Sequence, residues 1–332
     1  MSFRVRLRPS GREFEVEPQE TVLDAGLRSG VNLKYSCASG TCGECKARIV
    51  EGRLGESRFS DYVIGEAEKL RGYALLCCTT AASDLVIEAS AALHTADIPC
   101  QRLTARVAKV ERRGEDYLLL HLRTPRTQTL RFLAGQHVRL QFQDLPARAL
   151  AIASCPCNGM VLQFHLRCDA ADAFGHQVRS GLRVGESVTV EGPFGDFTLD
   201  DDSRRPLVML ALDTGFAPLK SLIEHAIALE LPQPIDLYWV ASHAGGHYLA
   251  NYCHAWEDAL DSFRFTPLVW ERAGGGPALQ ALARQVALGV PEDGAFDLYA
   301  SAPPPLTEAV LAACRARGLD AARVALDPLD SD

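Results

Sequence analysis

Four cysteines are the residues of this chain whose type and spacing most clearly suggest chemistry. Cys37, Cys42 and Cys45 fall within nine residues, and Cys77 follows after a further 31 residues. Thiolates are ligands for soft metals, and three of them so close in sequence must wrap around a small inorganic core. The backbone between them therefore has to turn tightly and approach that core closely.

The spacing Cys-x4-Cys-x2-Cys with a distant fourth cysteine is that of a plant-type [2Fe–2S] cluster. Gly40 and Gly43 lie inside the loop, where a residue without Cβ can take a positive φ. Four thiolates could instead hold zinc, but zinc sites usually contain two separated Cys-x2-Cys pairs, and only one tight pair is present here. We therefore predict that the four cysteines bind a [2Fe–2S] cluster, which carries single electrons.

The composition is that of an ordinary globular chain of 332 residues, long enough for two or three domains. A formal net charge of −8 argues against a nucleic-acid partner, which would require a basic face. No apolar run has the length of a membrane span, and no signal-peptide core follows Met1. With four of eleven cysteines assigned to a cluster, we expect a cytoplasmic protein in which the other cysteines are mostly small buried side chains.

Residues 1–93 have the pattern of a β-grasp domain built around the cysteine loop. Thr21, with Asp24 three residues later, predicts the N-cap of a helix that ends at Gly30. The flanking segments alternate apolar and polar residues, as half-buried strands do. The expected strands are Phe3–Arg8, Glu13–Val16, Lys46–Val50 and Asp84–Glu88, with a helical turn at Ile64–Leu70.

The rest of the chain predicts two further domains. Residues 101–200 contain short strands bounded by Gly, Pro and Asp, which favours an antiparallel β-barrel. Its expected strands are Leu103–Arg112, Tyr117–Leu122, Gln136–Gln141, Val161–Leu166 and Ser187–Glu191, with one helix at Ala173–Gly181. Residues 204–332 alternate apolar strands with helices, which predicts a nucleotide-binding-like α/β domain. The strands are Leu207–Leu212, Ile235–Val240, Arg264–Leu268 and Phe296–Ala300, and the helices are 216–230, 248–260, 277–287 and 306–317.

The whole chain resembles the ferredoxin–NAD(P)H reductases in which a [2Fe–2S] domain precedes a flavin barrel and a nicotinamide domain. It is most similar to the flavin iron–sulfur reductases of CDP-deoxyhexose biosynthesis and to their relatives that supply oxygenases. The segments that carry this resemblance are Gly72-Tyr-Ala-Leu-Leu-Cys77-Cys78, Ala134-Gly-Gln-His, Arg148, Glu191-Gly-Pro-Phe-Gly195, Thr214–Ser221, Leu237-Tyr-Trp239 and Tyr299–Pro305.

The resemblance implies a route for electrons. The family takes a hydride from NAD(P)H, separates the electron pair at FAD and passes single electrons through the cluster to a partner. By the same resemblance, Arg148, Gly192, Thr214 and Gly215 would contact flavin or nucleotide. It identifies no catalytic residue.

The flavin positions of that family are altered in this chain. The family holds flavin with Arg-x-Tyr-Ser, in which the arginine binds the pyrophosphate, the tyrosine stacks on the ring and the serine bonds near N5. Here the stretch is Arg148-Ala-Leu150-Ala151, which keeps only the arginine. The family's Gly-Gly turn corresponds to Ala171-Asp172-Ala-Phe-Gly175, which places a carboxylate near the expected diphosphate. The C-terminal aromatic residue that covers the flavin is missing from Val324–Asp332.

The nicotinamide positions differ as well. The family's Gly-Gly-Thr-Gly loop is replaced by Leu212-Asp213-Thr-Gly215, which adds bulk and negative charge. Ser301-Ala302-Pro303 stands where the family has Cys-Gly-Pro, whose cysteine adjoins the nicotinamide. No arginine occurs in Ala241–His247, after the Tyr-Trp strand, so a 2′-phosphate has no obvious partner and NADP is disfavoured.

These changes lead us to expect that the FAD and NAD(H) sites are lost, because each hydrogen bond to a charged group is worth about 1.5–3 kcal/mol. The main prediction is a [2Fe–2S] electron-transfer protein on a reductase-like scaffold. Its partner would be a redox enzyme, either an oxygenase, a dehydrase or another reductase component. One alternative is an active NADH-dependent reductase with atypically bound FAD that supplies an oxygenase or dehydrase. A second alternative is a non-redox binding subunit.

Overall fold

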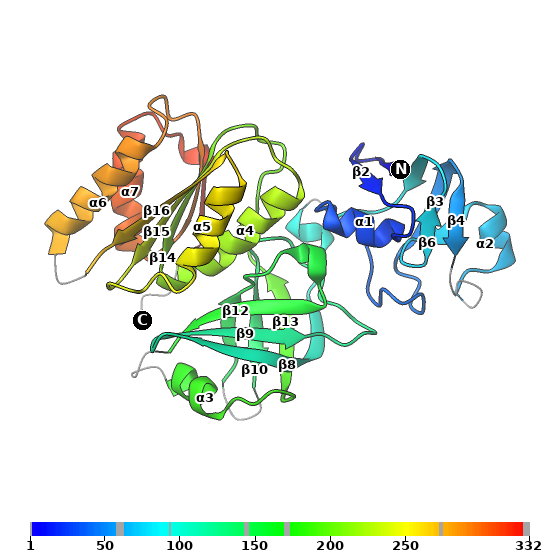
Figure 1. Ribbon diagram of the computed structural model, residues 1–332, viewed down its shortest axis with the longest axis horizontal. Helices are drawn as coiled ribbons and strands as arrows, with labels where there is room; N and C mark the ends of the chain where they lie inside the picture. Colours follow the sequence, from blue (N-terminus) through cyan, green and yellow to red (C-terminus); the bar gives the residue numbers. More distant parts are fainter. Residues whose placement is uncertain are drawn as a thin grey trace.

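Three β-sheet domains follow one another along the chain (Figure 1). The computed structural model describes residues 2–57, 63–92, 94–142, 146–168, 173–271 and 275–327. In Figure 1 the N-terminal domain is blue and cyan, the second domain is mostly green, and the C-terminal domain runs from yellow-green to red. Within the described ranges, no helix has both the length and the apolar character needed to cross a bilayer.

The N-terminal domain is a five-stranded sheet in the order β2-β1-β7-β3-β5, packed on helix α1. Alternation along β1 buries Val5 and Leu7 on the side of the helix. Thr21 caps α1 as predicted, since its hydroxyl accepts the Asp24 N–H at 3.1 Å, and Ser29 is the C-cap. The elements are β1 (Phe3–Arg8), β2 (Glu13–Val16), α1 (Val22–Arg28), β3 (Lys46–Glu51), β4 (Leu54–Ser57), α2 (Glu66–Leu70), β5 (Tyr73–Leu75), β6 (Thr79–Ala81) and β7 (Leu85–Glu88).

The second domain is a six-stranded antiparallel sheet in the order β11-β10-β13-β8-β9-β12. Its end strands β11 and β12 approach each other, which closes the sheet into a barrel around an apolar core. The predicted barrel is therefore confirmed, with β11 as a strand that the sequence pattern did not reveal. The elements are η1 (Thr95–Asp97), β8 (Gln101–Arg113), β9 (Tyr117–Arg123), β10 (His137–Gln141), β11 (Arg148–Ala151), η2 (Pro156–Asn158), β12 (Val161–Arg167), α3 (Ala173–Gly181) and β13 (Ser187–Phe194).

The C-terminal domain is a parallel sheet in the order β16-β15-β14-β17-β18 with helices on both faces. Every residue of the central strand β14 is buried, as expected for a strand covered on both sides. Met209 faces α4 and α5, whereas Leu210 faces α6 and α7. The elements are β14 (Leu207–Leu212), η3 (Asp213–Gly215), α4 (Phe216–Ala228), β15 (Ile235–Ala241), α5 (Ala250–Ala259), β16 (Phe263–Val269), α6 (Gly275–Gly289), β17 (Asp297–Ser301), α7 (Pro304–Arg315), η5 (Ala321–Arg323) and β18 (Val324–Asp327).

Direct contacts tie the N-terminal domain to both of the others. The Thr129 N–H donates to the Ser36 carbonyl at 2.9 Å, and the Asn32 side chain donates to the carbonyl of Phe132 at 2.7 Å. Arg12 forms an ion pair with Asp201, on the approach to the C-terminal domain, at 2.8 Å. The cysteine loop is therefore held against the barrel immediately before its first cysteine.

The start of α4 approaches the end of β17 without space for a side chain. A Cβ added at Gly215 would overlap the carbonyl oxygen of Ser301. Because backbone would have to move, we expect Gly215→Ala to lower the free energy of unfolding of this domain by about 1–3 kcal/mol. Gly276→Ala in α6 is the control, since a Cβ there meets no atom within 4 Å. Denaturant unfolding followed by tryptophan fluorescence measures both variants, and equal midpoints would contradict the close approach.

Candidate functional site

The cysteine loop turns tightly through three residues with positive φ. Gly40 and Gly43 both have φ of 80°, as the sequence predicts, and Ala38 has φ of 49°. Glycine takes this conformation without strain, whereas alanine does not. The Ala38 strain had no sequence signal, because it arises from the closure of the whole loop.

Hydrogen bonds and a sulfur contact group the four cysteines as two pairs. The N–H groups of Ser39 and Cys42 both donate to the Cys37 sulfur at 3.4 Å. On the other side, the sulfur atoms of Cys45 and Cys77 lie 3.2 Å apart. Strand β5 pairs with β3, which begins just after Cys45, and the chain beyond β5 brings Cys77 to this position. Two thiolates for each of two irons is the arrangement that a [2Fe–2S] cluster requires.

Hydrogen bonds within the cysteine loop act on the Cys37 thiol. Burial alone would raise the pKa of Cys37, but hydrogen bonds from Ser39 and Thr41 outweigh it and lower the pKa to about 5. At Cys37 these hydrogen bonds therefore favour the thiolate, which is the form that binds iron. Cys78 lies next to this set, with its sulfur 3.6 Å from that of Cys77.

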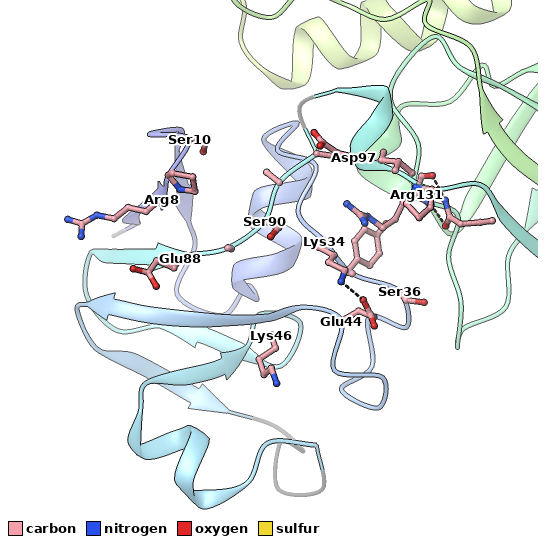
Figure 2. A pocket seen from close by; sticks show the side chains of 18 of the residues that line it. Arg8, Ser10, Lys34, Ser36, Glu44, Lys46, Glu88, Ser90, Asp97 and Arg131 are labelled. Atoms are coloured by element: carbon pink, nitrogen blue, oxygen red, sulfur yellow. Dashed lines mark hydrogen bonds and ion pairs between the residues drawn. The ribbon is translucent and has the colours of Figure 1, made fainter.

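A cleft of about 1500 Å³ separates the N-terminal domain from the barrel (Figure 2). Tyr35, Ser36 and Glu44 line it from the cysteine loop, and Glu44 forms an ion pair with Lys34 at 2.9 Å. Arg131 lines the barrel side, where burial lowers its pKa. Among the described residues, its Nε atom has no hydrogen-bond partner. Solvent thus reaches the residues that flank the cysteine loop from this side.

The altered flavin segment forms strand β11 at the edge of the barrel sheet. Its small side chains are not buried, and Ala149 is exposed. The Arg148 guanidinium lies 5.0 Å from the centre of the Phe174 ring, in the first turn of α3. Arg148 therefore lies near a helix N-terminus, where backbone N–H groups favour an anion. Ala171 and Asp172, expected to oppose a diphosphate, lie outside the described residues.

The turn from Gly192 to Gly195, at the end of β13, packs on β10. Gly192 has φ of 153°, and a Cβ there would lie 2.8 Å from a Val138 methyl group. At Gly195, a Cβ would lie 3.0 Å from the Nδ1 atom of His137. The carbonyl of Gly195 also accepts from the Gln136 side chain at 2.9 Å. These contacts give the two glycines a packing role at the edge where β11 also lies.

Asp213 has internal partners that the sequence did not show. Its Oδ2 lies 2.9 Å from an Arg167 guanidinium nitrogen, and its Oδ1 accepts from the Tyr117 hydroxyl at 3.0 Å and the Ser242 N–H at 2.9 Å. Asp213 has φ of 47° and is only 4% exposed. The expected negative charge beside a phosphate is therefore paired inside the protein. Arg167, Tyr117 and Ser242 were missed because none belongs to a recognisable motif.

Thr214 and Gly215 lie at the carboxyl edge of the parallel sheet. They follow β14 directly and adjoin the end of β17, its parallel neighbour. Ser301, at that end, donates its hydroxyl to Asp327 at 2.9 Å. Open α/β sheets bind ligands at this edge. The structure thus brings Thr214, Gly215 and Ser301 together, as the resemblance implied, while Arg148 lies on the barrel.

Two sequence profiles match the chain. One describes a 2Fe-2S iron-sulfur cluster binding domain and matches residues 5–82. The other describes an oxidoreductase FAD-binding domain and matches residues 104–199. The first match spans all four cysteines, and the second spans β11 with Arg148.

Relatives of known role match nearly the whole chain. The CDP-6-deoxy-L-threo-D-glycero-4-hexulose-3-dehydrase reductase of Yersinia pestis is 29% identical over 301 residues, 90% of each chain. Reductase component 1 of terephthalate 1,2-dioxygenase from Comamonas sp is 30% identical over 278 residues, 84% of this chain and 82% of the relative. The chain belongs to the ferredoxin-fused flavin iron–sulfur reductases. The toluate 1,2-dioxygenase electron transfer component of Pseudomonas putida is 30% identical over 314 residues. That match covers 94% of this chain and 93% of the relative.

Solved structures of such reductases have the same architecture. The Amycolatopsis cytochrome P450 reductase GcoB is 27% identical, with a TM-score of 0.60, and the match covers 98% of both chains. The ferredoxin reductase of carbazole 1,9a-dioxygenase, at 20% identity, has a TM-score of 0.59 over 99% of this chain and 98% of its own. This second likeness concerns the fold. The three-domain architecture and the electron-transfer class predicted from sequence are confirmed.

Membership of the flavin iron–sulfur reductases weighs against the expectation that the cofactor sites are lost. The FAD-binding profile spans the altered segment Arg148–Ala151, so the match tolerates those substitutions. In the C-terminal domain, Arg167 neutralises the carboxylate of Asp213 that was expected to repel a dinucleotide. The alternative of a working reductase therefore fits better than the main prediction of a carrier without flavin.

Proposed function

We propose that the protein is an NADH-dependent flavin iron–sulfur reductase that delivers single electrons to a partner enzyme. When bound, FAD supplies the hydride acceptor that releases electrons singly, and the cluster supplies a one-electron relay. Residues 1–93, 101–200 and 204–332 are proposed as the cluster, flavin and nicotinamide domains. In this proposal Cys37 and Cys42 bind one iron, and Cys45 and Cys77 bind the other.

The position of Arg148 is the observation that carries the flavin part of this proposal. Its guanidinium, near the start of α3, can pair with a diphosphate while the helix N–H groups bind the same anion. On the same strand Ala149 is exposed and Ala151 is half-buried, and we propose that these small side chains leave room for an isoalloxazine ring. Leu150, which stands at the position of the aromatic stack, packs partly against the barrel core. Gly192 keeps the neighbouring turn close to β10.

On the nicotinamide side, backbone rather than charged side chains would hold the dinucleotide. Thr214 and Gly215 precede α4, so their N–H groups lie where an anion is favoured. Asp213 does not oppose it, because its charge is paired with Arg167. After β15 the chain presents Ser242 and His243 rather than arginine, which supports NADH over NADPH.

The relatives indicate the class of electron acceptor. Their names describe reductase components of terephthalate and toluate dioxygenases and of a hexulose dehydrase. We therefore propose an oxygenase or a dehydrase component as the partner of this chain. Thr41, Cys42 and Glu44 form the exposed edge of the cysteine loop, where such a partner would contact the cluster domain.

Cofactor content and turnover test the proposal together. Acid-released flavin and iron are measured on the purified protein, followed by reduction of cytochrome c with NADH and with NADPH. We expect one FAD and two irons per chain, with faster reduction from NADH. Two irons without FAD, and no turnover after FAD is added, would instead identify the electron carrier predicted first. Activity without iron would reject both.

Arg148→Ala tests the flavin contact. A hydrogen bond to a charged group is worth about 1.5–3 kcal/mol, so the Kd for FAD should rise by about 10- to 100-fold. Titration of apoprotein with FAD, followed by flavin fluorescence, measures this change. Arg183→Ala is the matched control, because Arg183 is exposed in the segment after α3. Equal affinities in the two variants would place the pyrophosphate elsewhere.

A further inference from the structure

The turn Cys155–Gly159 touches all three domains. It follows β11 and contains the short helix η2. The Cys155 N–H donates to the Glu224 carboxylate of α4 at 3.1 Å, which links the turn to the C-terminal domain. On the other side it adjoins α1, and a Cβ at Gly159 would lie 2.7 Å from the Tyr35 hydroxyl oxygen. A change in the conformation of this turn would therefore alter its contacts with both neighbouring domains.

Cys155 and Cys157 face each other across this turn. Pro156 fixes the backbone between them, and the Cys157 N–H donates to the Cys155 sulfur at 3.3 Å. The Cys155 sulfur thus lies next to the backbone of Cys157. Residues two apart in a 3₁₀ turn fall within the separation of roughly 4.4–6.8 Å between Cα atoms that a disulfide spans. The Cα spacing of the pair is therefore compatible with a disulfide.

The two thiols also differ in the way that disulfide exchange requires. Cys155 is 7% exposed, whereas Cys157 is partly exposed and can meet a small reagent. The hydrogen bond with Cys155 lowers the pKa of Cys157, and the nearby Lys220 ammonium also favours its thiolate, although burial and Glu224 oppose this. The same hydrogen bond, together with burial, raises the pKa of Cys155. Cys157 is therefore suited to attack, and Cys155 to resolve.

We propose that Cys155 and Cys157 are a thiol–disulfide switch that exchanges with low-molecular-weight disulfides at the junction of the three domains. The Cys157 thiolate attacks one sulfur of the reagent, whose S–S bond breaks and releases one thiol after protonation. Cys155 then loses its proton and attacks the Cys157 sulfur, which releases the second thiol. Two protein thiols are oxidised to one disulfide, and one small disulfide is reduced to two thiols. This site does not depend on the proposed reductase activity.

Mass spectrometry of the holoprotein tests the switch. The protein is equilibrated without oxygen in graded ratios of reduced to oxidised glutathione, treated with iodoacetamide and cut with trypsin. The peptide from Ala149 to Arg167 contains only these two cysteines. As the ratio falls, we expect the doubly alkylated peptide to be replaced by an unalkylated peptide that is two hydrogens lighter than the dithiol form. A peptide that stays doubly alkylated, or that carries stable glutathione adducts instead, would overturn the proposal.

Two variants separate the roles of the pair. Cys155→Ser should trap glutathione on Cys157, because no second thiol remains to release it. Cys157→Ser should leave the buried Cys155 unmodified at the same ratios. Cys100 is the internal control, because it is exposed and no other cysteine lies near it in the sequence. It should form only a glutathione adduct. Equal glutathione occupancy of the two variants would reject the assigned order of attack, and the wild-type peptide still decides whether the disulfide forms.

Discussion

Cys77→Ser should leave a protein without the visible absorbance of a [2Fe–2S] cluster and with NADH-driven cytochrome c reduction at background level. The Cys77 sulfur lies 3.2 Å from that of Cys45 but belongs to a segment outside the cysteine loop, so serine would open the cluster site where the loop cannot compensate. Reduction of ferricyanide by NADH should continue, because flavin can pass electrons to it directly. The two acceptors, measured on the same preparation, separate cluster loss from flavin loss.

Cys78→Ser provides a close control for this result. Cys78 is the next residue, is similarly buried, and places its sulfur 3.6 Å from that of Cys77. If Cys77 is the ligand, the Cys78 variant keeps its iron and its cytochrome c reduction. Loss of iron from the Cys78 variant alone would instead assign the fourth ligand to Cys78. That outcome would still assign a [2Fe–2S] cluster to the wild-type protein and would change only the identity of its fourth ligand.

Asp213→Asn should destabilise the C-terminal domain by about 1–3 kcal/mol, because a buried carboxylate with three donors loses its charge. The Arg167 side chain is 39% exposed and can turn to solvent, which keeps the loss below that of a fully buried pair. Denaturant unfolding followed by tryptophan fluorescence reports this domain alone, since all three tryptophans lie between residues 239 and 270. Asp258→Asn, at an exposed carboxylate on α5, should unfold like the parent protein.

The same variant tests where the charge of Asp213 acts. If the carboxylate is paired inside the protein, its removal should leave the KM for NADH nearly unchanged. If it faced a bound diphosphate, Asp213→Asn would lower that KM, because a repulsive charge would be gone. A stable variant with tighter NADH binding would therefore contradict the inward pairing.

Local patterns in the sequence predicted most elements of the fold. The bounds of β1, β2 and β14 agree with the prediction to the residue, because an alternating or continuous apolar pattern marks each strand in the sequence, and the bounds of α3 agree as well. Strands β4, β5, β6, β11 and β18 were missed. Each has only three or four residues, and each depends on pairing with partners elsewhere in the chain. Short pairings of this kind leave little periodicity in the sequence.

The candidate site was predictable where ligands share one loop and not where partners are distant. The glycines of the cysteine loop showed their backbone requirement in the sequence, and both have positive φ. The charge of Asp213 was visible, but its neutralisation depends on Arg167, 46 residues earlier, and on Tyr117, 96 residues earlier. Counting charges without their partners made the nicotinamide site look more damaged than it is.

The hydrogen bonds between Ser36 and Thr129 affect how electrons would pass from flavin to cluster in the proposed reductase. Ser36 immediately precedes the first cysteine, and its carbonyl accepts both the Thr129 N–H at 2.9 Å and the Thr129 hydroxyl at 2.8 Å. These two hydrogen bonds hold the proposed cluster domain against the barrel. The cluster would therefore not need to move to a docking position before the flavin reduces it. Raising the solvent viscosity should therefore slow only the diffusion of the external acceptor to the cluster domain, and not electron transfer from flavin to cluster.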